Sequence, residues 1–151
     1  MFKIFFEDIA VGDEEKYGSY HVTREEIIEF AGKYDPQPFH LDDEIAKMSV
    51  FGKLCASGWH TCSMVMRMLV DHMMDVGFAG MGSPGIDNLR WRKPVFPGDT
   101  LSVHTTITAK KDMPSRPNMG IVQAHYKIFN HLGETVMTMD TNVMVLLRSG
   151  K

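Results

Sequence analysis

The pattern of apolar and polar positions divides the chain into a helical first part and a strand-rich second part. In the first part, apolar residues recur three or four positions apart, as they do on one face of an amphipathic helix. This spacing predicts a helix that starts after Thr23, a short helix over residues 42–48, and a long helix from residue 58 to about residue 76. From residue 82 the period changes to two, which is typical of half-buried strands.

Local signals indicate where these helices begin and end. Thr23, followed three residues later by Glu26, forms a capping box, and Pro36 ends the helix that the box starts. Ser57 is suited to cap the long helix. Because that helix is apolar on nearly all of its faces, we expect it to be buried in the core.

The second part of the chain alternates between strands and loops rich in proline or glycine. Its strands are predicted at 86–91, 100–109, 119–130 and 135–147, with a hairpin turn at 131–134, and one further strand is predicted at 17–22, before the first helix. A buried helix followed by antiparallel strands that wrap around it belongs to the α+β class. No linker or repeat interrupts the sequence, so we expect residues 1–151 to form one domain.

Composition and charge narrow the classes of function. The chain has 151 residues, 44% of them apolar and 23% charged, which is typical of a soluble globular protein. Its net charge of −3 argues against nucleic acid as a partner. No apolar run is long enough to span a membrane, and Glu7 and Asp8 interrupt the only N-terminal candidate for a signal peptide. Cys55 and Cys62 match no zinc or redox spacing, so we expect small buried residues in a reducing, cytoplasmic setting.

The strongest chemical signal is the segment Asp35-Pro36-Gln37-Pro38-Phe39-His40. A proline fixes its own φ, lacks an N–H and disfavours the α region for the residue before it. The segment therefore cannot continue a regular helix, and it holds a carboxylate and an imidazole on a stiff support. Such a pair is suited to proton-transfer chemistry.

Four segments together resemble the MaoC-like dehydratases, the branch of the hot-dog fold that includes the (R)-specific enoyl-CoA hydratases. The segments are 6–13, 34–40, 56–61 and 92–101, and they occur in the order typical of that family. The resemblance covers most of the chain. It implies a hot-dog fold, in which an antiparallel sheet wraps around a long central helix.

The resemblance also implies roles for individual residues. Around the catalytic pair the family has the pattern Asp-x-Asn-Pro-x-His, which Asp35, Pro38 and His40 match. In the family, this acid and histidine act on one water molecule, while a backbone N–H at the start of the central helix polarises the thioester carbonyl. The glycine of that helix start corresponds to Gly58. Gln37 stands where the hydratases usually have Asn, and its extra methylene makes it a candidate for altered substrate preference.

Other polar residues are weaker candidates for substrate binding. Ser57 either contacts the substrate or only caps the helix. Arg90, Arg92 and Lys93 form a basic cluster that is either a solvated surface or a site for the phosphates of coenzyme A. Lys53, Lys110, Lys111 and Arg116 are less favoured for the same role. His60 is expected to be a hydrogen-bonded core histidine, and no histidines and acids stand at metal-ligand spacing.

The expected function is an acyl-CoA hydratase that interconverts trans-2-enoyl and (R)-3-hydroxyacyl thioesters without a metal or redox cofactor. A hot-dog thioesterase is less favoured, because no Asp or Glu lies between Gly58 and Arg67 on the central helix. A non-catalytic acyl-thioester-binding module is less favoured because Asp35 and His40 are both present. An exposed sheet edge would need cover, so we expect a homodimer or a higher homo-oligomer.

Overall fold

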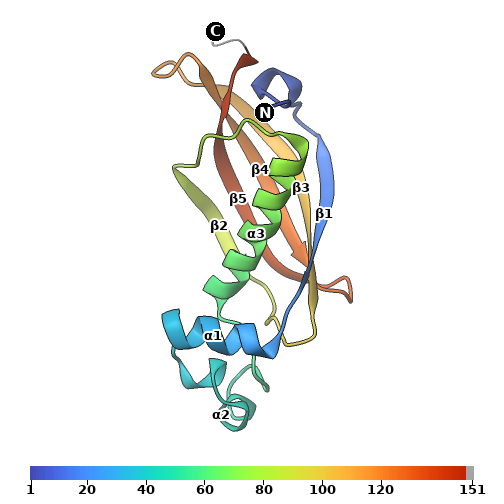
Figure 1. Cartoon of the computed structure of the whole chain (residues 1–151), viewed down its shortest axis with the longest axis vertical. Coiled ribbons are helices and arrows are strands. Elements are labelled where there is room, and N and C mark those ends of the chain that lie inside the picture. Colours follow the sequence, from blue (N-terminus) through green and yellow to red (C-terminus); the bar gives the residue numbers. More distant parts are fainter. Residues whose placement is uncertain (149–151) are drawn as a thin grey trace.

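The long helix that the apolar pattern predicts is α3 (Gly58–Val76), and it lies across one face of a five-stranded sheet (Figure 1). The computed structural model describes residues 1–148. Gly77 ends α3 in the left-handed conformation, with φ of 72°, which glycine adopts without steric strain. Among the described residues, no helix combines the length and apolar character that a membrane span requires.

The sheet is antiparallel throughout, with the strand order β1-β3-β4-β5-β2. Its strands are β1 (Glu14–His21), β2 (Gly85–Trp91), β3 (Thr100–Asp112), β4 (Met119–Phe129) and β5 (Thr135–Leu146). β3 runs beyond the predicted end at residue 109, because its pairing with β4 continues as far as Asp112 and Gly120. β1 and β2 form the two edges of the sheet.

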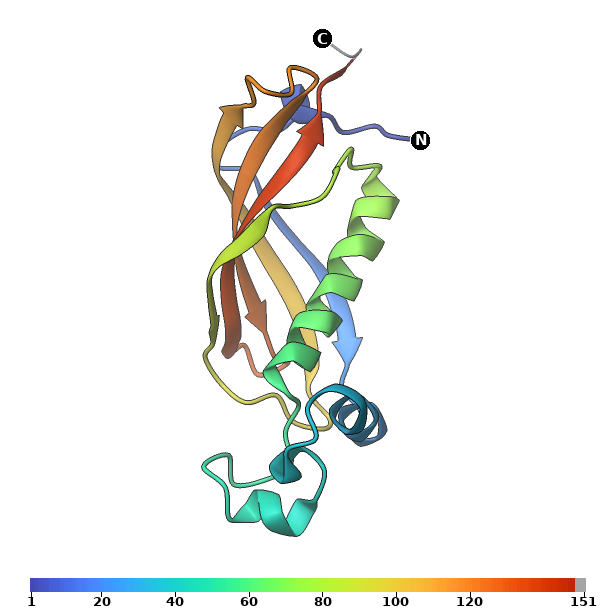
Figure 2. The same ribbon diagram turned by 90° about the vertical axis from the view of Figure 1, so that its left-hand side faces the viewer.

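The core lies between α3 and the inner face of the sheet. Figure 2 shows α3 on one side of the curved sheet, and no helix of the described chain covers the other side. Fully buried side chains from the strands include Leu101, Ile128, Val136 and Met137. This arrangement confirms the α+β class. The expectation that α3 is buried in the core is wrong for one face, whose exposed apolar residues are Trp59, Met66, Val70 and Met74.

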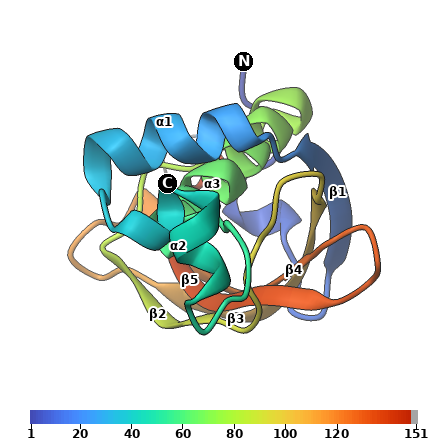
Figure 3. The same ribbon diagram turned by 90° about the horizontal axis from the view of Figure 1, so that it is seen from below.

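Two short helices, α1 (Arg24–Tyr34) and α2 (Asp43–Lys47), lie at the N-terminal end of α3 (Figure 3). The Thr23 hydroxyl accepts a hydrogen bond from the Glu26 N–H at 3.2 Å, which confirms the predicted cap of α1. The reciprocal bond of the capping box is not formed, because the Glu26 carboxylate bonds to Tyr20 and His60 instead. The fold therefore brings the end of α1, the proline-containing segment and the start of α3 together.

Candidate active site

The proline-containing segment, residues 35–40, follows α1 and ends in a single 3-10 turn, Pro38–His40. Asp35 is the residue that ends α1, with φ of −148° and ψ of 68°, and the ring of Pro36 prevents the helix from continuing. Gln37 is extended, with φ of −71° and ψ of 134°. The predicted break in the helix is confirmed, and it leaves Asp35 and His40 on a short rigid link.

Asp35 and His40 face each other across a small gap. The distance between His40 Nε2 and Asp35 Oδ2 is 3.5 Å, and both side chains are largely buried. On its other side, His40 Nδ1 lies 2.8 Å from the carbonyl oxygen of Cys55. Because a carbonyl oxygen only accepts hydrogen bonds, Nδ1 must carry the hydrogen. Nε2 is therefore the nitrogen that a neutral His40 presents to Asp35 with a free lone pair.

The carboxylate of Asp35 is held by two further side chains. The Ser57 hydroxyl donates to Oδ2 at 2.6 Å, and the Gln37 amide donates to Oδ1 at 2.7 Å. Burial raises the pKa of Asp35, but these hydrogen bonds and the nearby His40 outweigh burial and hold the pKa below its usual value. Asp35 is therefore ionised at neutral pH.

The start of α3 lies directly beside this pair. Ser57 occupies the N-cap position, but its side chain makes no capping hydrogen bond and its hydroxyl donates to Asp35. The interpretation of Ser57 as only a helix cap is therefore wrong. Gly58 is the first residue of α3, where backbone N–H groups have no carbonyl partner within the helix and the helix dipole is positive.

A tryptophan explains why residue 58 is a glycine. A Cβ atom added at Gly58 would lie 2.4 Å from Cε2 of Trp91, at the end of the edge strand β2. Trp91 in turn meets Trp59 edge to face, with ring centroids 5.5 Å apart. The contact could not be predicted from the sequence, because residues 58 and 91 meet only through the fold.

A known protein family matches most of this chain. The sequence pattern of the MaoC like domain family matches residues 9–126. The chain belongs to the MaoC-like domain family. The crystal structure of a MaoC-like dehydratase from Rhodospirillum rubrum is 40% identical, with a TM-score of 0.87 over 97% of this chain and 99% of that one. The predicted hot-dog fold is therefore confirmed.

Two curated relatives of this MaoC-like chain differ in how much of their length it matches. The protein YdeM of Bacillus subtilis is 26% identical over 142 residues, which cover 92% of this chain and 96% of YdeM. The mesaconyl-CoA hydratase of Cereibacter sphaeroides is 35% identical over 74 residues. That match covers 49% of this chain and 21% of the hydratase, so it relates only part of each protein.

The basic cluster of the MaoC-like chain makes its contacts away from the pair. Arg92 Nε donates to the Thr138 hydroxyl at 3.1 Å, and Lys93 forms an ion pair with Glu134 on the turn between β4 and β5. In the part of the chain that the structure describes, the Arg90 side chain donates only to the backbone carbonyl of its neighbour Leu89. Within residues 1–148, no hydrogen bond or ion pair joins this cluster to Asp35 or His40. A contact with phosphates stays a prediction.

Of the two cysteines that the sequence predicts to be buried, Cys55 is buried and Cys62 is half-buried. Cys55 is fully buried, which raises the pKa of its thiol to about 11, and burial also raises the pKa of Cys62. Cys55 contacts His40 through its backbone carbonyl, which the sequence does not reveal. In the described part of the chain, no group of three or more His, Cys, Asp or Glu side chains is placed to hold a metal ion.

A second buried imidazole lies on the first turn of α3. His60 Nε2 is 3.1 Å from Glu26 Oε1, and the ring stacks on Phe30 with centroids 4.8 Å apart. His60 Nδ1 is buried and has no hydrogen-bond partner among residues 1–148. The predicted core histidine is thus hydrogen-bonded through one of its two nitrogens.

Proposed function

We propose that the chain is an acyl-CoA hydratase/dehydratase that interconverts trans-2-enoyl-CoA and (R)-3-hydroxyacyl-CoA. The observation that carries the proposal is the geometry of Asp35 Oδ2 and His40 Nε2, which lie 3.5 Å apart beside the start of α3. The names of two relatives, a dehydratase and a hydratase, support the class of reaction. The (R) configuration of the product is taken from the resemblance to the (R)-specific hydratases.

In the proposed reaction, a water molecule contacts both Asp35 and His40. A separation of 3.5 Å without a direct hydrogen bond suits two groups that share one water. One of the two side chains accepts a proton from the water, while the oxygen of the water bonds to C3 of the enoyl group. The pair then delivers a proton to C2, so that both residues return to their starting state. Positioned acid–base groups of this kind each contribute about 10²–10⁴-fold to a rate.

The backbone N–H of Gly58 is the proposed donor to the thioester oxygen. Negative charge develops on that oxygen when the hydroxyl adds to C3, and the positive end of α3 favours it. Loss of one such donor typically raises a barrier by about 2.7–4 kcal/mol. Because the same helix start carries Ser57, the oxyanion donor and the Asp35 carboxylate are held in one rigid frame.

Coenzyme A enters the proposal as part of the substrate. Addition of water leaves no net oxidation or reduction, so the reaction needs no redox cofactor. Of the three basic residues at 90–93, Arg90 is the most available for a phosphate, because within the described residues its side chain donates only to the adjacent backbone carbonyl. Lys93 would first have to leave Glu134.

A homodimer joined along β2 is part of the proposal. β2 is an edge strand, and the molecule exposes several large apolar side chains on or near it. Those on β2 are Ile86 and Trp91, and those on the neighbouring face of α3 are Trp59, Met66 and Val70. A second copy that pairs with this edge would cover both the unpaired backbone groups and the apolar surface.

A panel of enoyl-CoA thioesters tests the proposed reaction. Loss of the conjugated absorbance should show hydration of at least one substrate. Asp35→Asn and His40→Ala should each slow hydration by about 10²-fold or more, with the fold retained by circular dichroism. Full activity in both variants would exclude the assigned roles. Release of free coenzyme A without hydration would support a thioesterase. Tight binding of acyl-CoA with neither reaction would support a binding module.

A further inference from the structure

The imidazole of His40 belongs to a cluster with two phenyl rings that have no part in the proposed proton transfer. The ring of Phe39 meets the imidazole edge to face, with centroids 4.6 Å apart. The ring of Phe51 is inclined by 27° to the imidazole, with centroids 6.3 Å apart. The two phenyl rings also meet each other, with centroids 5.4 Å apart. Aromatic rings attract one another at centroid distances of about 4.5–7 Å, so each ring of the cluster interacts with the other two.

A tight turn after α2 brings Phe51 to this cluster. Ser49 Oγ donates to the carbonyl oxygen of Ala46 at 2.6 Å and accepts from the N–H of Phe51 at 3.2 Å. The N–H of Gly52 donates to the carbonyl oxygen of Ser49 at 3.2 Å. Gly52 has a φ of 76°, which glycine adopts without steric strain. The backbone of Phe51 is therefore fixed by local hydrogen bonds, although its side chain is only half-buried.

The segment that starts at Phe51 also holds both members of the proposed catalytic pair. The carbonyl oxygen of Cys55 lies 2.8 Å from His40 Nδ1, and the Ser57 hydroxyl donates to Asp35 at 2.6 Å. The bond at Nδ1 fixes one atom of the imidazole. It leaves the plane of the ring free to tilt, because the ring torsion of histidine has broad energy minima. A ring packed against the imidazole restricts that tilt.

We propose that Phe51 is a positioning residue, which sets the plane of the His40 imidazole so that Nε2 faces Asp35 at a constant distance. This inference rests on the proposed function, in which both side chains contact one water. A displacement of about 1 Å in such a geometry can slow a reaction about 10²-fold. Phe39 is adjacent to His40 on the same 3-10 turn and moves with it. Phe51 comes from a separate turn, so it ties the imidazole to the loop that leads into α3.

Two measurements on His40 test the inference without turnover. In a protein labelled with ¹⁵N-histidine, the signals of His40 are those that His40→Ala removes. At a pH where the ring is neutral, we expect a single tautomer with the hydrogen on Nδ1, and exchange-broadened signals in Phe51→Ala. Diethyl pyrocarbonate acylates neutral imidazoles, and His40 is only 5% exposed. Peptide mapping by mass spectrometry should show that His40 is modified several-fold faster in Phe51→Ala.

Kinetics distinguish positioning of His40 from contact with the substrate. Phe51→Ala should lower kcat by about 10–10²-fold and leave KM within a few-fold. Phe51→Tyr keeps the ring and should retain kcat within a few-fold. The acid limb of the pH profile of kcat/KM should stay in place in Phe51→Ala, because Ser57 and Gln37 still hold the carboxylate of Asp35.

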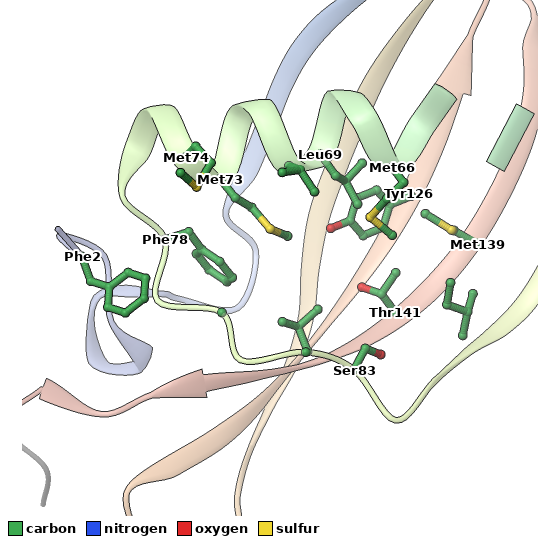
Figure 4. A pocket seen from close by; sticks show the side chains of 15 residues that line it. Phe2, Met66, Leu69, Met73, Met74, Phe78, Ser83, Tyr126, Met139 and Thr141 are labelled. Carbon is green, nitrogen blue, oxygen red and sulfur yellow. The ribbon is translucent and has the colours of Figure 1, made fainter. Parts of the chain in front are cut away.

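Two control variants separate positioning from a general loss of stability. Val50→Ala removes a 97% exposed apolar side chain from the same turn, and it should change neither kcat nor the signals of His40. Met139 lines an apolar cavity beside the second half of α3 (Figure 4). Met139→Ala should lower the free energy of unfolding and leave the signals of His40 unchanged. If Phe51→Ala fails to fold, Phe51→Leu also removes the ring and is read by the same measurements.

The outcomes distinguish this inference from the proposed function. If no enoyl-CoA is hydrated, but the signals and the reactivity of His40 change in Phe51→Ala, then Phe51 positions His40 and the proposed function fails. If hydration occurs and Phe51→Ala leaves kcat, the signals and the reactivity unchanged, the inference is overturned. A fall in kcat with unaltered signals of His40 would also overturn it. An increase in KM with unchanged kcat would do the same, since the ring would then contact the substrate.

Discussion

Two buried histidines flank the start of α3, and each faces a carboxylate from α1. His40 and His60 are 5% and 3% exposed, so burial does not distinguish them. His40 lies 3.5 Å from Asp35, without a direct hydrogen bond, while its other nitrogen is fixed by the Cys55 carbonyl. His60 is hydrogen-bonded to Glu26 at 3.1 Å.

The carboxylates of the two pairs differ as much as the histidines. One oxygen of Glu26 accepts from both His60 and the Tyr20 hydroxyl, the latter at 2.5 Å, so that pair closes on itself. Asp35 is instead held at both oxygens by Ser57 and Gln37, which fix the carboxylate without filling the gap toward His40. A catalytic pair needs such a gap for a substrate or a water, whereas a structural pair is more stable without one.

The largest expected effect comes from replacing the carboxylate of the Asp35–His40 pair with a neutral amide, and the same change in the Glu26–His60 pair provides the comparison. Asp35→Asn should reduce kcat by about 10²–10⁴-fold, because an amide cannot accept the proton. Glu26→Gln should instead leave kcat within a few-fold and lower the free energy of unfolding, because Tyr20 and His60 lose a charged acceptor. Steady-state kinetics and urea denaturation of both variants measure the difference. A large loss of kcat in Glu26→Gln with unchanged stability would contradict the distinction.

Gly58→Ala should both destabilise the protein and reduce activity. The added methyl group would overlap the Trp91 ring, and overpacking of this kind typically costs about 1–3 kcal/mol. The double variant Gly58→Ala with Trp91→Ala removes the overlap and should recover much of the free energy of unfolding. If kcat stays low in the double variant, the methyl group also blocks the substrate, whereas full recovery of kcat would show that packing alone requires the glycine.

His60→Ala should destabilise the protein more than it affects catalysis. The substitution removes the stacking on Phe30 and leaves Glu26 with one donor fewer, for an expected loss of about 1–3 kcal/mol. Burial lowers the pKa of His60 more than Glu26 raises it, so the ring is neutral when folded. The pH profile of kcat/KM should therefore keep its shape in His60→Ala, and a displaced limb would give His60 a role in proton transfer.

Ser57→Ala should move the acid limb of kcat/KM to higher pH. The Ser57 hydrogen bond is one cause of the lowered pKa of Asp35, so its removal raises that pKa. Activity requires the ionised carboxylate of Asp35, so it is lost as the pH falls through the pKa that Asp35 has in the folded protein. The contribution of Asp35 to the free energy of unfolding also falls with pH. It is fully present above the unfolded pKa of about 3.9, and it is lost as the pH falls through the lower pKa of the folded state. An unchanged acid limb would show that Ser57 does not control Asp35.

Gln37→Asn is expected to have the smallest effect. The shorter side chain restores the residue that the hydratases usually have, but it shortens the reach of the amide that donates to Asp35 Oδ1 at 2.7 Å. We expect a few-fold change in kcat and a shift in the preferred enoyl-CoA. The substrate panel measures both, and an unchanged preference would remove Gln37 from the determinants of specificity.

Local sequence patterns predicted the elements well. The helix expected over residues 58–76 is α3, and Thr23 and Pro36 bound α1 because capping and proline geometry depend on neighbouring residues only. The proline signals also drew attention to Asp35 and His40, whereas Gly58 was a candidate through the resemblance to the family. The local patterns missed how Ser57 is used, because its bond to Asp35 spans 22 positions and competes with the local cap.

The features of the site that the sequence could not predict depend on contacts between residues far apart in the chain. The bond from His40 to Cys55 O spans 15 positions, and the pair of His60 and Glu26 spans 34. Composition and periodicity carry no information about which backbone carbonyl will meet an imidazole. The basic cluster illustrates the same limit, since Arg92 and Lys93 are adjacent in sequence yet their partners are on β5 and on the β4–β5 turn.

The position of Cys55 has a consequence for how the protein tolerates oxidants. The residue that anchors His40 does so through its backbone, while its thiol is buried and stays protonated. Only thiolates react readily with peroxides and alkylating reagents. The chain has two cysteines, and burial raises the pKa of both. The site should therefore keep its geometry through oxidative stress that inactivates enzymes with an exposed thiolate.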